Sequence, residues 1–131
     1  MSQTQAGPPP RALVVDDSAV ERMVGEFALR RLGYGPVTAE TLAGALRAWE
    51  SGPFALVLLD MHLPDGEGWD LAAELRRREP AGRRTPMLVV SGSAEPEDRE
   101  RCLRAGADGF LAKPLSPGAL AEAVARLVGS N

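Results

Sequence analysis

The feature that most constrains the fold of this chain is a set of short apolar runs that each end in a polar or charged residue. Three of them are "ALVVDD" (residues 12–17), "FALVLLD" (54–60) and "PMLVVS" (86–91). Short runs without alternation of polar and apolar residues are typical of strands that are buried on both faces. Such strands occur in parallel sheets, so we expect helices to cover both faces of the sheet.

Segments with helical spacing of their apolar residues lie between these runs. Helices are expected over residues 18–32, 41–49, 69–79, 95–106 and 116–129, a weak, short strand over 36–40 and a fifth strand over 108–113. Ser18, with Glu21 three residues later, resembles a capping box. The apolar stripe of the first helix comprises Val20, Val24, Phe27 and Leu32. This alternation predicts an α/β fold with a single doubly wound five-stranded parallel sheet and five helices.

The chain is large enough for one domain with a single core. Residues 1–10 are rich in proline and are expected to form a flexible tail, followed by one domain over residues 11–129 and by no output domain. The arginines between Leu75 and Thr85 allow two interpretations, a solvated helix end or a docking patch for an acidic partner.

Composition argues against nucleic acid and membranes as partners. The chain has 18 acidic and 15 basic residues and a net charge of −3, so it lacks the basic field that nonspecific nucleic-acid binding needs. Its apolar runs are far shorter than the roughly 20 residues of a membrane span. There is no recognisable signal peptide, and Cys102 is the single cysteine. These features predict a cytoplasmic protein.

Each expected strand ends in a residue that is unusual for a protein interior. Asp16 and Asp17 end the first run, Asp60 and Ser91 end two others, and Lys113 ends the last strand. Because ligands of open α/β sheets bind outside the carboxyl ends of the strands, these side chains are expected to converge. Carboxylates in one small site repel each other unless a cation lies between them, and oxygen ligands favour Mg²⁺. The hydroxyl and ammonium groups complete a site for a tetrahedral anion such as phosphoryl.

Four motifs carry a family resemblance. "VVDDS", "LLDMHLPDGEG", "VVSGS" and "GADGFLAKPL" occur in this order and resemble the motifs of response-regulator receiver domains. The resemblance extends from about Arg11 to Gly129, nearly the whole chain. It implies a flavodoxin-like fold in which the five strands have the spatial order 2-1-3-4-5.

The resemblance also implies a role for the residues at the strand ends. Asp60 would accept a phosphoryl group from a phosphohistidine. Mg²⁺ would be held by Asp16, Asp17, Asp60 and the backbone carbonyl of His62. Lys113 would bind one phosphoryl oxygen.

A conformational switch follows from the same resemblance. Ser91 would bond a second phosphoryl oxygen, and Phe110 would turn inward with it, so that the face formed by residues 95–106, 108–113 and 116–129 repacks. Phe110 lacks the hydroxyl group of the commoner tyrosine, so the switch would act by packing alone. The Lys113–Pro114 peptide bond is usually cis in this family.

Three positions depart from the family pattern. Gly66 replaces a large apolar residue and Gly92 replaces an alanine, so the loops that carry them are expected to be more mobile. His62 lies at a variable position that tunes dephosphorylation and is expected to be an exposed loop residue.

The function implied is that of a phosphorylation-switched signalling domain in a two-component phosphorelay, not an enzyme. Its partners would be a histidine kinase or a histidine phosphotransfer protein, a downstream protein target and, through the switched face, a second copy of the chain. The alternative is a receiver domain taken from a hybrid histidine kinase.

Three enzyme or cofactor classes are more distant alternatives. A Mg²⁺-dependent phosphatase with an aspartyl nucleophile would need an acid where His62 stands. A flavin-binding electron carrier would need a phosphate loop in place of "DDSAVE". A GTPase would need the motif G-x-x-x-x-G-K-[ST], which the sequence lacks.

Overall fold

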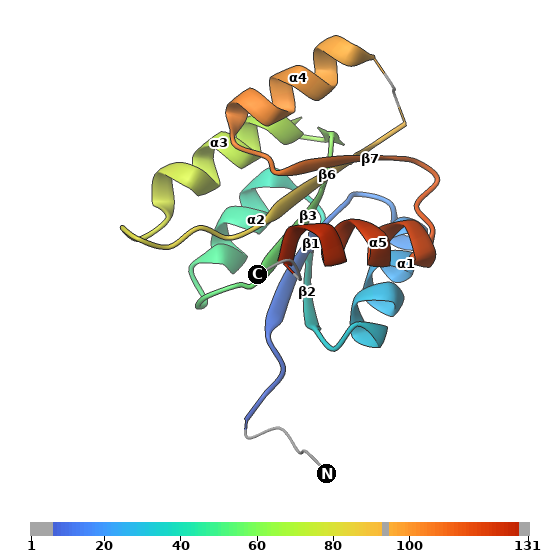
Figure 1. Cartoon of the computed structure of the whole chain (residues 1–131). Coiled ribbons are helices and arrows are strands. Elements are labelled where there is room, and N and C mark those ends of the chain that lie inside the picture. The colour runs from blue at the N-terminus through green and yellow to red at the C-terminus, as the bar shows by residue number, and fades with distance from the viewer. Residues whose placement is uncertain (1–6, 93–94, 129–131) are drawn as a thin grey trace.

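The computed structural model describes residues 7–92 and 95–128, and a five-stranded parallel sheet lies at its centre (Figure 1). The spatial order of the strands is β2-β1-β3-β6-β7. Their bounds are Arg11–Val15 (β1), Gly35–Ala39 (β2), Leu56–Asp60 (β3), Met87–Ser91 (β6) and Gly109–Ala112 (β7). Numbered along the chain, these strands have the order 2-1-3-4-5, so the predicted doubly wound α/β fold is confirmed.

Five helices cover the two faces of this sheet (Figure 1). They are α1 (Ala19–Arg31), α2 (Leu42–Trp49), α3 (Gly68–Arg78), α4 (Pro96–Ala105) and α5 (Pro117–Val128). On the face of α1 and α5, Leu29 and Leu120 belong to the same core cluster as Val14. On the other face, Leu71 of α3 belongs to a cluster with Leu13. Successive strand residues point to opposite faces, which explains why the strand sequences are apolar without alternation.

The buried face of α1 differs from the predicted one. Val20 and Phe27 of the predicted stripe are 69% and 55% exposed, and Met23 between them is 65% exposed. The helix instead turns Gly25 towards the sheet, where an added Cβ atom would lie 3.3 Å from Cδ2 of Leu58. The helical period therefore predicts α1 correctly, whereas the choice of buried stripe was wrong because a small residue allows closer packing on the sheet.

A small antiparallel hairpin, which the sequence did not predict, follows β3. Its strands are β4 (His62–Leu63) and β5 (Gly66–Glu67). In its turn, the Asp65 carboxylate accepts hydrogen bonds from the backbone N–H groups of Leu42 (2.7 Å) and Ala43 (3.0 Å), and these bonds lower its pKa. Leu42 also fills the space beside Gly66, where an added Cβ atom would lie 2.7 Å from Cδ1 of Leu42. These contacts tie the hairpin to α2, although Gly66 by itself predicted a looser loop.

The arginine-rich segment at the end of α3 contains a structural residue. Arg76 donates hydrogen bonds to the backbone carbonyls of Thr85 (2.8 Å) and Gly106 (2.9 Å). It also forms ion pairs with Glu79 (2.7 Å) and Asp108 (2.8 Å). Arg76 thus joins α3 to the connection between α4 and β7, a role that neither sequence interpretation of the arginine cluster included.

None of the helices in residues 7–92 and 95–128 is long and apolar enough to cross a membrane.

Candidate functional site

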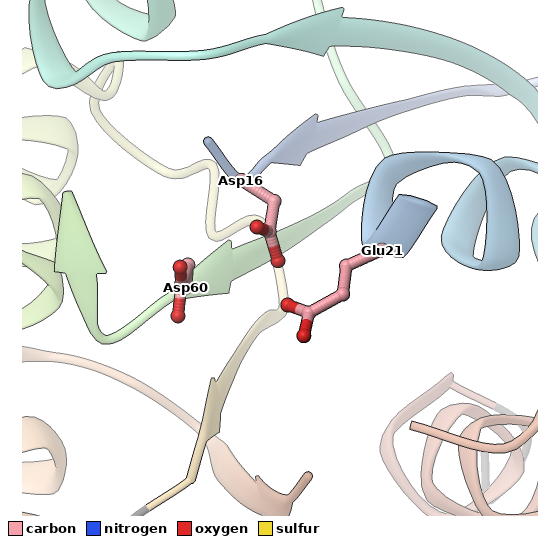
Figure 2. A group of neighbouring side chains, drawn as sticks. All are labelled: Asp16, Glu21 and Asp60. Atoms are coloured by element: carbon pink, nitrogen blue, oxygen red, sulfur yellow. The ribbon is translucent and has the colours of Figure 1, made fainter. Parts of the chain in front are cut away.

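The carboxyl ends of β1 and β3 bring two buried carboxylates together. Asp60 is the last residue of β3, and Asp16 directly follows β1. The strands are neighbours with Val15 opposite Leu59, so Asp16 and Asp60 leave the sheet side by side. Asp16 is 8% exposed and Asp60 is 5% exposed. Figure 2 shows both side chains at the ends of their strands.

A third carboxylate comes from α1, and the sequence did not predict it as part of the site. Oxygen atoms of Asp16, Glu21 and Asp60 lie within 4.8 Å of one another (Figure 2). The hydroxyl of Ser18 accepts a hydrogen bond from the N–H of Glu21 (3.2 Å), as expected for a cap. The N–H of Ser18, however, donates to Asp16 (2.9 Å), so the carboxylate of Glu21 is not used in a capping box.

The signal that could have identified Glu21 is its position in the chain. A helix that begins directly after a strand-end acid places its first turn at the same edge of the sheet as that acid. Glu21 occupies this first turn of α1.

Two other residues that were predicted to bind the cation, Asp17 and His62, are exposed. Asp17 is exposed and is not a member of the group of three carboxylates. The side chain of His62 is 65% exposed, and its Nδ1 lies 2.7 Å from a carboxylate oxygen of Glu67, its partner across the hairpin. The predicted roles of Asp17 and of the His62 backbone carbonyl as cation ligands stay predictions.

Lys113 supplies a positive charge to the site. Its Nζ lies 2.5 Å from Oε1 of Glu21, 3.0 Å from Oδ1 of Asp60 and 3.7 Å from Oδ2 of Asp16. A cavity of only about 10 Å³ remains among these side chains and their neighbours. In this arrangement the lysine and the three acids fill the site themselves.

The two predicted switch residues lie on β6 and β7. Ser91 is fully buried at the end of β6, and its carbonyl accepts a hydrogen bond from the backbone N–H of Lys113 (2.8 Å). Phe110 lies opposite Val89 and is half-buried against the core. The peptide bond between Lys113 and Pro114 is cis. Ser91 therefore lies at the same sheet edge as the acids, and Phe110 lies on the neighbouring edge strand.

Burial and charge change the protonation equilibria of the site. Burial raises the pKa of Asp16 to about 6, and the charge of Asp60 acts in the same direction. Hydrogen bonding to Lys113 lowers the pKa of Glu21. Burial by itself would lower the pKa of Lys113, but the pairing with Glu21 and Asp60 outweighs it and raises this pKa. Once Asp16 loses its proton, three carboxylates face one ammonium group.

This donor set fits a hard cation. Carboxylate oxygens are the ligands that Mg²⁺ prefers, and a cation between them would offset the repulsion between Asp16 and Asp60.

We expect Mg²⁺ to raise the Tm more at about pH 7.5 than at about pH 5. The pKa of Asp16 is raised from 3.8 to about 6, so the stability that this group contributes is present below pH 3.8 and is lost as the pH rises through about 6. A cation can offset that loss only where Asp16 is ionised, because protons compete with it at lower pH. Thermal melts with and without millimolar Mg²⁺ measure the difference. Asp16→Asn should reduce the dependence on pH, and equal shifts at both pH values in the wild type would contradict the prediction.

Comparisons with known proteins place this site in a family context. The family model of the response regulator receiver domain matches residues 12–125. The sensory/regulatory protein RpfC of Xanthomonas campestris pv. campestris (strain 8004) is 34% identical over 122 residues. The phosphate regulon transcriptional regulatory protein PhoB of Escherichia coli (strain K12) is 38% identical over 117 residues. The alignments cover 92% and 89% of this chain but 17% and 49% of the two relatives, so the chain spans less than half of their length.

Solved structures are similar over nearly the whole chain. The chemotaxis response regulator CheY4 of Vibrio cholerae is 27% identical with a TM-score of 0.83, and the match covers 92% of this chain and 99% of that one. The receiver domain of the sensor histidine kinase PA1611 from Pseudomonas aeruginosa PAO1 is 34% identical with a TM-score of 0.81, and the match covers 93% and 99%. That structure has a magnesium ion coordinated in its active site cleft.

Proposed function

This chain belongs to the response regulator receiver domain family, and from that membership we propose that it is a phosphorylation-switched domain of a two-component phosphorelay with Asp60 as the phosphoacceptor. The observation that carries the proposal is the buried carboxylate of Asp60, which lies 3.0 Å from the ammonium group of Lys113 and beside a second buried acid, Asp16. Receiver domains are signalling domains and not classical enzymes, which favours a switch over the phosphatase, flavin and GTPase alternatives.

The proposed chemistry is a substitution at phosphorus. An oxygen of Asp60 attacks the phosphorus of a phosphohistidine, a P–O bond forms, the P–N bond breaks, and its electron pair returns to the imidazole. Because β3 is buried along its length, the Asp60 carboxylate is held at the sheet edge with little conformational freedom. Lys113 pairs with the negative charge on the phosphoryl oxygens.

The same residues would hold a cation. Asp16, Glu21 and Asp60 have oxygens close enough to share one, and the family resemblance adds Asp17 and the backbone carbonyl of His62. Mg²⁺, when bound, would supply further positive charge beside the transferred group. The magnesium ion in the PA1611 receiver domain supports this assignment.

The partner would be a cytoplasmic histidine kinase or histidine phosphotransfer protein. An exposed apolar stripe on α1, formed by Val20, Met23 and Phe27, supports a protein partner at this edge. The stripe begins next to Glu21, so a partner that covers it would stand beside Asp60. On phosphorylation, Ser91 and Phe110 would repack the face of α4, β7 and α5, through which a downstream protein or a second copy would bind.

Labelling with a small phosphodonor tests the proposal. We expect Mg²⁺ and acetyl phosphate to transfer one phosphoryl group per chain, as a hydroxylamine-labile acyl phosphate, and to change the fluorescence of Trp69. Trp69 is a suitable reporter because it lies in the first turn of α3 and contacts α4. The guanidinium of Arg101, a residue of α4, lies 4.3 Å from the centre of its ring. An unlabelled protein would contradict the proposal, and continuous turnover of a small phosphate ester would favour the phosphatase instead.

A further inference from the structure

The shortest ion pair of the site involves Glu21, whose role in the proposed phosphoryl transfer is so far limited to the group of three carboxylates that would hold a cation. Nζ of Lys113 lies 2.5 Å from Oε1 of Glu21 but 3.0 Å from Oδ1 of Asp60. Coulomb attraction grows as the distance falls, so Glu21 is the strongest single partner of the ammonium group. Lys113 is therefore already engaged before any phosphoryl group arrives.

Glu21 also places a negative charge where the charge of a phosphoryl group would be added. Its carboxylate lies within 4.8 Å of that of Asp60. A phosphoryl group on Asp60 would replace the single negative charge of the carboxylate with up to two negative charges on the phosphoryl oxygens, and it would extend beyond the carboxylate. The two negative groups would repel each other at this short distance.

The lack of free space in the site also makes the phosphoryl group compete with Glu21 for a place beside Lys113. With the Glu21–Lys113 pair in place, the remaining cavity is about 10 Å³, which is far too small for a phosphoryl group. The side chain of Glu21 is 36% exposed and belongs to the first turn of α1, so it can turn outward to solvent more readily than the nearly buried Asp16 or Asp60. When a phosphoryl group is added to Asp60, Lys113 would exchange Glu21 for the phosphoryl oxygens.

We propose that Glu21 is a positioning residue that holds Lys113 in the unphosphorylated arrangement and thereby weakens the phosphorylated state. This inference rests on the proposed function of Asp60. Glu21 is then an intramolecular competitor of the phosphoryl group for Lys113. The extent to which this domain responds to phosphorylation is therefore set partly by a carboxylate on α1.

Beryllofluoride, which stands in for a phosphoryl group on an aspartate, provides the test. At saturating Mg²⁺ we expect Glu21→Gln to lower the Kd for beryllofluoride by about fivefold, because the amide releases Lys113 and removes the repulsion. The fluorescence of Trp69 reports the titration. Glu122→Gln, at an exposed position of α5, removes the same charge and should leave the Kd unchanged. Glu21→Asp, which is one methylene shorter, should give an intermediate Kd.

A Mg²⁺ titration without beryllofluoride separates competition from structural damage. Glu21→Gln should bind Mg²⁺ more weakly, because one of the three carboxylates is lost, while it binds beryllofluoride more tightly at saturating Mg²⁺. A damaged site would bind both more weakly, and that result would overturn the inference, as would an unchanged Kd for beryllofluoride. If the wild type neither binds beryllofluoride nor accepts phosphoryl from acetyl phosphate, the proposed function itself fails and the inference falls with it.

Discussion

Replacing Asp60 with asparagine is expected to abolish phosphoryl incorporation from acetyl phosphate and from a phosphohistidine donor. A neutral amide lacks the charged oxygen that attacks phosphorus, so the reaction loses its nucleophile. Asp16 is not expected to substitute for it. Asp16 lies 3.7 Å from the ammonium group of Lys113, farther than Asp60 at 3.0 Å, so its oxygens are less well placed to attack a phosphoryl group that Lys113 binds.

The loss of labelling in Asp60→Asn should occur without a loss of stability. Asparagine has nearly the same shape as aspartate, and removing the charge of Asp60 relieves its repulsion with Asp16, which adds to the effect of burial on the pKa of Asp16. The variant should therefore melt no lower than the wild type, which circular dichroism can measure on unphosphorylated samples of both proteins. Glu122→Gln serves again as the charge-matched control and should accept phosphoryl at the wild-type level. Full labelling of Asp60→Asn would show that another residue is the phosphoacceptor.

Replacing Arg76 with alanine is expected to cause the second large effect, a loss of about 3 kcal/mol in the free energy of unfolding. The Arg76 side chain is 13% exposed and pairs with Glu79 and Asp108, whose side chains are 8% and 20% exposed. Truncation leaves both carboxylates without this partner and also removes hydrogen bonds to the carbonyls of Thr85 and Gly106. For a domain of this size the Tm should fall by roughly 10 °C.

The neighbouring arginine provides the matched control for this prediction. Arg77 is 70% exposed and pairs with Glu74 at 3.2 Å on the surface of α3. Arg77→Ala should change the free energy of unfolding by less than about 0.5 kcal/mol, because solvent screens such pairs. Urea titration of the two variants measures the difference, and equal stabilities would contradict the structural role of Arg76.

The strands and the residues at their ends were predictable because both depend on local sequence. A run such as residues 54–60 has no polar residue until Asp60, so it suits a strand that is covered on both faces and that presents its first carboxylate at the sheet edge. The rule that parallel strands end at a common edge then brings Asp16, Ser91 and Lys113 towards the same place. The motif resemblance added the strand order, which the structure confirms.

The sequence by itself determined the α/β architecture, the central strand that carries Asp60 and the set of strand-end residues, because apolar runs and helical periods act over a few neighbouring residues. The tertiary structure decided which stripe of α1 is buried, because Gly25 fits against Leu58 only when the helix meets the sheet. It also decided that Glu21 joins the site while Asp17 remains exposed. The place of Glu21 in the first turn of α1 is a local feature, but its pairing depends on Lys113, more than 90 residues later in the chain, and no local pattern encodes that contact.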